Sequence, residues 1–468
     1  MREIRALSAT GMLGTGYSAE SLDRAMQWQP HFIGVDAGSS DWGPFYLGSG
    51  RTQASHGATK RDLRLLLKAG RAANIPVIVG SAGTSGGEPH LAFTRQIVEE
   101  IAQEEGLHFR MALIHAEIDK DYLTDKLGNG KIHPLHPAPS IDTSTIQRAS
   151  RIVGQMGAEP FMAALQAGAE VIIAGRASDT SIYAALPLLE GLAPGPVWHA
   201  AKILECGAAS VEQRLHPDCL MAWIRDDEFI VEPPHPGMRC TPTSVVAHTL
   251  YENADPYRLV EPSGTLDTRS ATYEHSSDRA VRVRGSKFEP ANRYTVRLEA
   301  TEYLGHRYSL IAGIRDPMVL RQLDPFLAGL RTRINEKVIA SLGLTMDRDY
   351  QMVYRIYGKD GSMGSLEPTP QVTGHEVGLV LEVIAPDAAK ARDILTIAGH
   401  TGLHHPIPEW HGLISNFAFP YSPPEMDAGP VYRFSMNHVL ELDDPMEPFR
   451  VELVEVGTPA LAGAAGNR

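Results

Sequence analysis

VIIAGRASDTS, residues 171–181, is a short apolar run that ends in Gly-Arg-Ala and four polar side chains. Successive residues from Val171 to Ala174 are all apolar, as in a strand of a parallel sheet that helices cover on both faces. The polar residues at its carboxyl end fall where parallel α/β sheets bind their ligands. The stretch therefore predicts an α/β fold with a ligand site at the end of this strand.

Earlier segments repeat this pattern of a short apolar run followed by a helical segment. The other runs are residues 4–9, 32–37, 76–82 and 109–118. Between them, KRDLRLLLKAGRAAN (60–74) places Leu63, Leu66 and Leu67 on one helical face. Strands that alternate with helices predict a mostly parallel sheet with flanking helices, and we assign this α/β domain to residues 1–215.

The hydrophobic pattern changes after residue 215. YTVRLEATEY (294–303) alternates apolar and polar residues, which is typical of an antiparallel strand with one face toward water. Arg297, Glu299 and Thr301 occupy the polar face of this strand. Alternation of this kind predicts an antiparallel sheet in the C-terminal half of the chain.

Near the end of the chain, the pattern predicts a β-β-α unit. QMVYRIYG and EVGLVLEVIAP read as strands, and a helical segment follows with Pro386 and Asp387 at its start. We therefore expect an α+β domain over residues 216–456. The small residues of 457–468 predict a frayed tail.

The composition excludes some classes of function. The 468 residues carry a net charge of −13, which argues against binding nucleic acid or an anionic membrane through bulk charge. No signal peptide or membrane-spanning run is evident. Three cysteines without metal-binding spacing fit a reducing compartment. We therefore expect a cytoplasmic protein without nucleic-acid or membrane partners.

Small and ionisable residues follow the predicted parallel strands. Small residues let backbone N–H groups approach an anionic ligand, and an arginine holds a carboxylate with its planar fork. The predicted substrate-binding residues are Arg176, Gly38, Ser39, Ser81, Gly83 and Ser178. Because the carboxyl ends of parallel strands share one edge of a sheet, we expect these loops to meet at one pocket.

Three carboxylates near the same strand ends are the predicted acid–base catalysts. They are Asp36, Glu117 and Asp179. A structural role is the alternative: Asp179 caps the next helix, or pairs with Arg176 as a clamp. The sequence leaves both the catalytic role and the structural role of Asp179 open.

No motif in the sequence identifies a cofactor. Gly11, Gly14 and Gly16 do not spell GxGxxG, and GxxxxGK[ST] is absent. The histidines of residues 400–411 lack a compact metal-binding spacing. We therefore predict no metal ligands and leave the cofactor unassigned.

Four segments in series resemble the acyclic terpene utilisation family, AtuA. They are GRASDTSIYAALPLLE, WHAAKILECGA, TPTSVVAHTLYENADPYRLVEPSGTLDT and SNFAFPYSPPEMDAGPVYRF. The resemblance implies a catabolic setting. It also implies a divergent short form that lacks the small additional C-terminal domain of longer members and pairs with a small separate partner protein.

The function expected from these observations is that of a hydratase or dehydratase-type lyase. Its substrate is a small carboxylic acid or an acyl thioester such as an acyl-CoA. One alternative is a metal-assisted amide or ester hydrolase with ligands such as Asp36 and His115. Another is a non-catalytic subunit that needs its small partner. We also expect a homo-oligomer, because residues 279–313 read as an exposed sheet edge.

Overall fold

A computed structural model describes residues 2–369, 371–407, 409 and 414–457. The chain forms two compact units, one of Met1–Glu302 with Phe434–Arg468 and the other of Tyr303–Arg433. The division at residues 302 and 303 lies far from the change of pattern at residue 215. Apart from Gly457, the predicted frayed tail lies outside the described residues.

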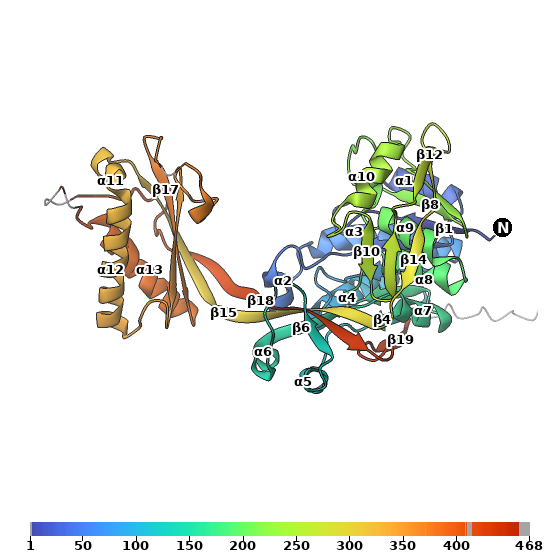
Figure 1. The fold of residues 1–468 in the computed structure, drawn as a ribbon, viewed down its shortest axis with the longest axis horizontal. Helices are drawn as coiled ribbons and strands as arrows, with labels where there is room; N and C mark the ends of the chain where they lie inside the picture. Colours follow the sequence, from blue (N-terminus) through green and yellow to red (C-terminus); the bar gives the residue numbers. More distant parts are fainter. Residues whose placement is uncertain (1, 370, 408, 410–413, 458–468) are drawn as a thin grey trace, which may run out of the picture. The chain divides into compact units, whose positions relative to one another are not determined.

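The first unit is built on a ten-stranded sheet with the order β12-β13-β9-β8-β1-β2-β3-β7-β4-β19. Figure 1 labels β12, β8, β1, β4 and β19 of this sheet. The five central strands of the sheet pair in parallel: β1 (Ile4–Ser8), β2 (Phe32–Asp36), β3 (Val77–Gly80), β7 (Val171–Ala174) and β4 (Phe109–Ile114). These are the five strands that the apolar runs predict. The predicted α/β class is confirmed.

Helices cover both faces of this sheet, so each central strand contributes to two cores. Ala6 and Ile172 pack into one core, while their neighbours Leu7 and Ile173 pack into the other. The helices of the unit are α1 (Ala19–Gln27), α2 (Pro44–Ser49), α3 (His56–Ala73), α4 (Glu88–Glu105), α5 (Lys120–Gly128), α6 (Thr143–Arg148), α7 (Glu159–Gln166), α8 (Ser181–Leu189), α9 (Pro194–Leu204), η1 (Ala208–Ser210) and α10 (Pro242–Leu250). Continuous apolar strands are therefore required, because neither face meets water.

Antiparallel strands extend the same sheet at both ends. They are β8 (Leu220–Ile224), β9 (Glu228–Glu232), β13 (Val281–Arg284) and β12 (Thr272–His275) beside β1, and β19 (Val451–Val456) beside β4. Residues 216–302 therefore belong to the first unit. Of the exposed sheet edge expected over residues 279–313, the part at β13 is wrong because β13 pairs with a strand on each side, whereas β14 (Lys287–Pro290) is the end strand of a three-stranded sheet.

Short strands complete the first unit. β10 (Arg258–Glu261), β11 (Gly264–Asp267) and β14 (Lys287–Pro290) form a small antiparallel sheet. Two long strands, β15 (Tyr294–Ile314) and β18 (Met426–Leu442), have residues in both units. In the first unit, β15 pairs with β6 (Ala149–Gln155), and β18 pairs with β5 (Ile132–Pro134).

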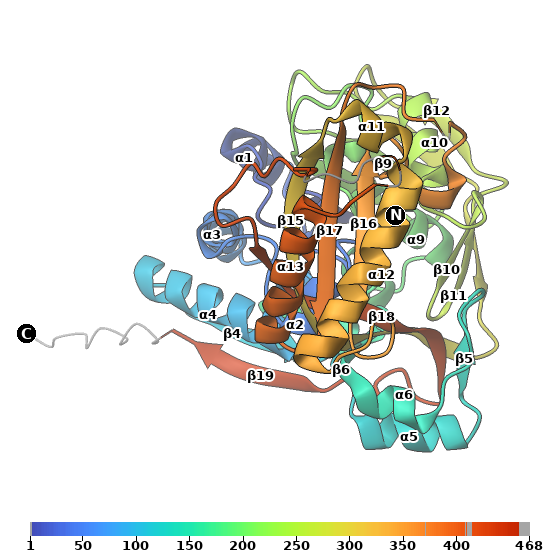
Figure 2. The same cartoon turned by 90° about the vertical axis from the view of Figure 1, so that its left-hand side faces the viewer.

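The second unit is an antiparallel sheet with helices on one face, as the β-β-α pattern predicts. β17 (Val377–Ala385) pairs with β15 and with β16 (Gln351–Tyr357), and every second residue of β17 is buried. The helical elements are α11 (Pro317–Arg321), α12 (Leu323–Leu342), η2 (Gly364–Leu366) and α13 (Ala388–Leu403). Figure 2 shows α12 and α13 side by side against the sheet. Asp387 caps α13 by accepting a hydrogen bond from the Lys390 N–H.

Among the described residues, each helix falls short of the length or the apolar character that a membrane span requires.

Candidate functional site

Strand β7 delivers Arg176 to the carboxyl edge of the parallel strands. Gly175 follows the strand directly, and a Cβ atom there would lie 2.6 Å from the carbonyl oxygen of Gly86. The Arg176 N–H donates to the same oxygen at 3.2 Å. The loops that follow β3 and β7 therefore touch through their backbones, which is possible only because both positions are glycine.

Gly86 offers a direct test of this close approach. Its φ is +67°, and a Cβ atom would lie 2.0 Å from the backbone nitrogen of Arg176. Gly106 has a similar φ of +63° with open space around it. We expect Gly106→Ala to cost about 1 kcal/mol of unfolding free energy, and Gly86→Ala to cost a further ~1–3 kcal/mol. Urea denaturation of the two variants measures the difference, and equal losses would contradict the close approach.

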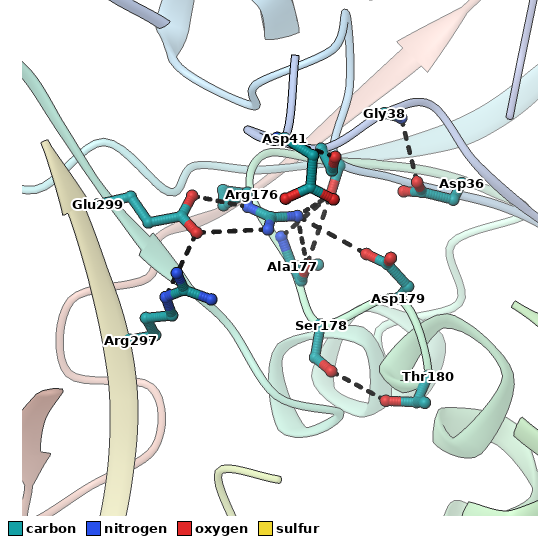
Figure 3. A network of polar contacts seen from close by, with 12 residues as sticks. Asp36, Gly38, Asp41, Arg176, Ala177, Ser178, Asp179, Thr180, Arg297 and Glu299 are labelled. Atoms are coloured by element: carbon teal, nitrogen blue, oxygen red, sulfur yellow. Dashed lines mark hydrogen bonds and ion pairs between the residues drawn. The ribbon is translucent and has the colours of Figure 1, made fainter. Parts of the chain in front are cut away.

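Arg176 lies at the centre of a polar network and is almost fully buried (Figure 3). Its Nε donates to Glu299 at 3.0 Å, and its Nη2 donates to the other Glu299 oxygen at 3.5 Å. Its Nη1 donates to the Ser81 hydroxyl at 3.2 Å and lies 3.6 Å from Asp179. The planar fork of the guanidinium is therefore already occupied by a protein carboxylate.

Glu299 comes from strand β15 and is only 3% exposed. Burial by itself raises the pKa of Glu299, but Arg176, with further help from Arg297 and Ser40, holds that pKa below its ordinary value. Thr301 on the same strand face is also buried. The expectation that this face of β15 meets water is therefore wrong for both residues, since Glu299 pairs with Arg176 of the loop after β7 and Thr301 is fully buried.

A pocket of about 640 Å³ opens beside this network. Its walls come from the loop after β2, the loop after β7, the end of α9, residues 252–262 and strand β15. Carboxylates and cations both line it: Asp41, Asp179, Glu205, Glu252, Glu261, Arg176, Lys202, Arg258 and Arg297. The volume suits a small organic molecule.

Asp179 is the carboxylate of the β7 loop that faces this pocket. Its side chain is 36% exposed, and no described residue makes a hydrogen bond with its Oδ1. Burial raises the pKa of Asp179 to about 6; Arg176 opposes this shift and Asp41 adds to it. A carboxyl group with this pKa exchanges protons readily near neutral pH.

Glu261, the last residue of β10, provides a second carboxyl group at the pocket. It accepts hydrogen bonds from the Ser178 hydroxyl at 2.8 Å and the Thr180 hydroxyl at 2.6 Å. Burial raises the pKa of Glu261 to about 7, against the effect of these two hydrogen bonds. Asp179 and Glu261 are therefore two pocket carboxyls with raised pKa values.

The raised pKa of Glu261 predicts a pH-dependent stability. The folded state holds this proton more tightly than the unfolded state, so the stabilisation is complete below about pH 4.5 and is lost as the pH rises through about 7. In the wild type, the free energy of unfolding should fall by on the order of 3 kcal/mol between these two pH values because of Glu261. We expect this fall to be absent in Glu261→Gln. Urea denaturation from pH 4.5 to 8 measures it, with the exposed Glu20→Gln as control. An unchanged slope in the Glu261 variant would contradict the assignment.

Two arginines reach the pocket with part of their side chains open to solvent. Arg297 is 47% exposed; its Nε donates to Asn437 at 3.2 Å and lies 3.6 Å from a Glu299 carboxylate oxygen (Figure 3). Among the described residues, none accepts a hydrogen bond from its Nη1 or Nη2. Arg258 is 35% exposed and donates to Glu289 at 2.7 Å. Arg297 therefore offers the freer fork for an anion.

The structure brings some of the predicted site residues to this pocket and leaves others outside it. Ser39, Arg176, Ser178 and Asp179 line the pocket. Ser81 lies outside the pocket lining, but its hydroxyl accepts the hydrogen bond from Nη1 of Arg176. The other predicted residues are Asp36, Gly38, Gly83 and Glu117, and none of them lines it.

The residues outside the pocket have structural partners. Asp36 is buried and accepts a hydrogen bond from the Gly38 N–H at 3.1 Å; its pKa is raised by burial and by Asp179. Glu117 pairs with Arg151 at 3.1 Å. A Cβ atom on Gly38 would lie 2.5 Å from the Thr84 backbone, so this glycine serves contact between loops.

Several pocket residues come from the second half of the first unit and were not predicted from the sequence. They are Lys202, Glu205, Glu252, Arg258, Glu261 and Arg297. Glu261 lies within TPTSVVAHTLYENADPYRLVEPSGTLDT, so the family resemblance was the available signal for it. Nothing in the local pattern separates Glu299 from an ordinary solvent-facing glutamate.

Two groups of described residues have the spacing to hold a metal ion. They are Glu205 with Cys206 and His248, and His216 with Asp218 and His235. Neither group contains Asp36 or His115, the ligands considered for a hydrolase. His115 instead contacts Glu88 and Arg450. Of the late histidines, His404 bonds the Ile414 backbone, and His411 lies outside the described residues.

Comparison with known proteins places the chain in a family. A sequence model described as acyclic terpene utilisation family protein AtuA matches residues 55–210 and 224–407. No curated protein and no solved structure matches the chain. Both matched stretches contribute residues to the pocket, and the match is consistent with a catabolic role. The chain belongs to the acyclic terpene utilisation family, AtuA.

Proposed function

We propose that the protein is a hydratase or dehydratase-type lyase that acts on a small carboxylic acid or its acyl thioester. The observation that carries this proposal is the convergence of Asp179 and Glu261 on one pocket, each with a raised pKa. Adding or removing water needs one group that takes a proton and another that delivers one to oxygen. A pair of carboxyls with pKa values of about 6 and about 7 meets both needs.

Asp179 acts as the base and Glu261 as the acid in this proposal. The lower pKa of Asp179 leaves it mostly ionised at neutral pH, whereas Glu261 keeps more of its proton. In dehydration, Asp179 takes a proton from carbon, and Glu261 protonates the hydroxyl group that leaves as water. Hydration is the reverse of these two transfers.

The substrate anion is bound by Arg297, and Arg176 positions the base. The terminal nitrogens of Arg297 are available for a bidentate contact to a carboxylate. Arg176 is committed to Glu299, and its charge keeps Asp179 more acidic than burial alone would leave it. The predicted binding role of Ser39 and Ser178 fits their places on the pocket wall.

The family supports a catabolic setting and an acyclic substrate. Its description names the utilisation of acyclic terpenes, so an acyclic unsaturated or hydroxylated acid or acyl-CoA is the substrate class we propose. A small partner protein, a homo-oligomeric state and a cytoplasmic location are also parts of this proposal. Light scattering of the purified chain tests the oligomer.

The test is a screen for addition or loss of water. The purified chain is incubated with a panel of acyclic 2-enoic and 3-hydroxy acids and their CoA thioesters, and mass spectrometry follows the gain or loss of one water. We expect conversion by the wild type and conversion at least ~100-fold slower by Asp179→Asn. Conversion by the Asp179 variant at the wild-type rate would overturn the assignment of the base. Hydrolysis of the thioester without change in the acid would overturn the lyase.

A further inference from the structure

Three ligand-type side chains meet where helix α9 ends against helix α10. Glu205 and Cys206 directly follow α9, and His248 lies in the last turn of α10. One carboxylate oxygen, the thiol sulfur and one imidazole nitrogen lie within 4.8 Å of one another. We propose that these three residues bind a divalent transition-metal ion of the zinc class.

The imidazole of His248 provides an independent observation. The residue is 6% exposed, and its buried Nε2 has no hydrogen-bond partner among the described residues. A buried polar atom without a partner destabilises the fold, because its lost hydrogen bonds to water are not replaced. The ring is held by a hydrogen bond to the backbone of Lys202 and by stacking on Tyr251 at 5.9 Å between centroids. A metal ion supplies the missing partner to a ring that is already oriented.

The donor set selects the class of ion. Thiolate, imidazole and carboxylate together suit Zn²⁺ and similar ions, whereas Ca²⁺ and Mg²⁺ prefer oxygen ligands throughout. Three protein ligands leave a fourth position for water or substrate, as in catalytic zinc sites. Glu205 lines the pocket, so the ion would border the same cavity as Asp179.

Carboxyl groups and cations both surround the three ligands. Glu205, Asp179 and Glu252 act on Cys206 as negative charges against the ammonium of Lys202. Lys202 and Arg214 act on His248 as positive charges. The Lys202 Nζ lies 2.5 Å from Oε1 of Glu205 and holds this carboxylate in place. Groups that orient metal ligands in this way contribute to metal affinity, and their loss typically weakens binding by about 10–100-fold.

The second cluster, His216 with Asp218 and His235, serves as a matched control. Nδ1 of His216 and Nδ1 of His235 are both engaged by backbone groups. The Asp218 carboxylate accepts hydrogen bonds from the Ser21 hydroxyl at 2.7 Å and the Cys219 N–H at 2.9 Å. The spacing resembles that of a metal site, but both Asp218 oxygens and one nitrogen of each histidine already have hydrogen-bond partners.

The experiment measures metal binding without any activity assay, so its outcome is independent of the proposed lyase reaction. The untagged chain is stripped with a chelator and dialysed against Zn²⁺ or Co²⁺, and elemental analysis gives the metal content. We expect about one ion per chain and, with Co²⁺, a near-ultraviolet thiolate-to-metal charge-transfer band. Cys206→Ser should lose the band and weaken binding by at least ~10–100-fold. His216→Ala should keep both.

Circular dichroism establishes that each variant is folded, and His248→Gln provides a second variant of similar size. A wild-type chain that takes up no stoichiometric metal would overturn the proposal. So would a wild-type cobalt spectrum without the thiolate band, whatever the variants do. Equal losses in the Cys206 and His216 variants would show that the metal binds elsewhere.

Discussion

Replacing Arg176 by alanine is expected to lower the free energy of unfolding by about 3–5 kcal/mol. The change leaves the Glu299 carboxylate, which is 3% exposed, without the fork that holds it at 3.0 Å. A buried charge that loses its partner keeps the whole cost of leaving water. Urea denaturation at neutral pH measures the loss.

Two further variants sharpen the Arg176 test. Arg258 pairs with Glu289 at the surface, so Arg258→Ala should cost no more than about 1 kcal/mol. The double variant Arg176→Met with Glu299→Leu removes both charges and should be more stable than Arg176→Ala alone. An Arg176→Ala variant as stable as Arg258→Ala would contradict the buried pair.

Arg176→Lys separates a structural role from a binding role. Lysine keeps the charge but cannot present the planar fork to Glu299. We expect reduced stability with little change in substrate affinity, because the fork is already committed to the protein. A full-stability variant that loses substrate binding would instead favour Arg176 as the carboxylate anchor.

Asp179→Asn is expected to reduce turnover by ~10²–10⁴-fold, the usual contribution of one acid–base group. Asparagine has the same shape but cannot take a proton at neutral pH. Because the side chain is 36% exposed, the fold should survive, and circular dichroism with urea denaturation checks this. Turnover is measured with the substrate that the water-addition screen identifies.

Asp41→Asn is the matched control for Asp179 because it changes a neighbouring carboxylate of the same pocket. Asp41 raises the pKa of Asp179, so removing its charge should lower that pKa. If Asp179 is the base, the acidic limb of the pH–rate profile, near pH 6 in the wild type, moves to lower pH. A limb that stays in place would exclude Asp179 as the group that titrates.

The sequence was most informative where local pattern and packing agree. Leu63, Leu66 and Leu67 share one helical face, and all three are fully buried in α3. The strands of the parallel sheet follow equally well from their apolar runs. The alternating pattern of β15 correctly predicted a strand. It wrongly predicted that the polar face is exposed to solvent at Glu299, because a glutamate in a buried ion pair gives the same sequence pattern as a glutamate at the surface.

Only the part of the pocket wall that comes from the loops after the parallel strands was predicted from the sequence. The loops after β2 and β7 were recognised, and Ser39, Ser178 and Asp179 do line the pocket. Asp36 and Glu117 share their residue type and their place after a strand, yet neither reaches the pocket. Sequence position fixes which edge of the sheet a residue reaches, but the packing of the loops decides which side chains face the cavity.

The sequence by itself determined the central parallel sheet, its covering helices and the delivery of Arg176 and Asp179 at the end of β7. These features depend on periodicity and on neighbours along the chain. Only the tertiary structure decided that Arg176 meets Glu299, which lies 123 residues away, and that Glu261 closes the pocket. The physical reason is that a guanidinium donates equally well to any carboxylate within reach. Which one is within reach depends on how β15 and β10 pack against the loop, and no local pattern records that.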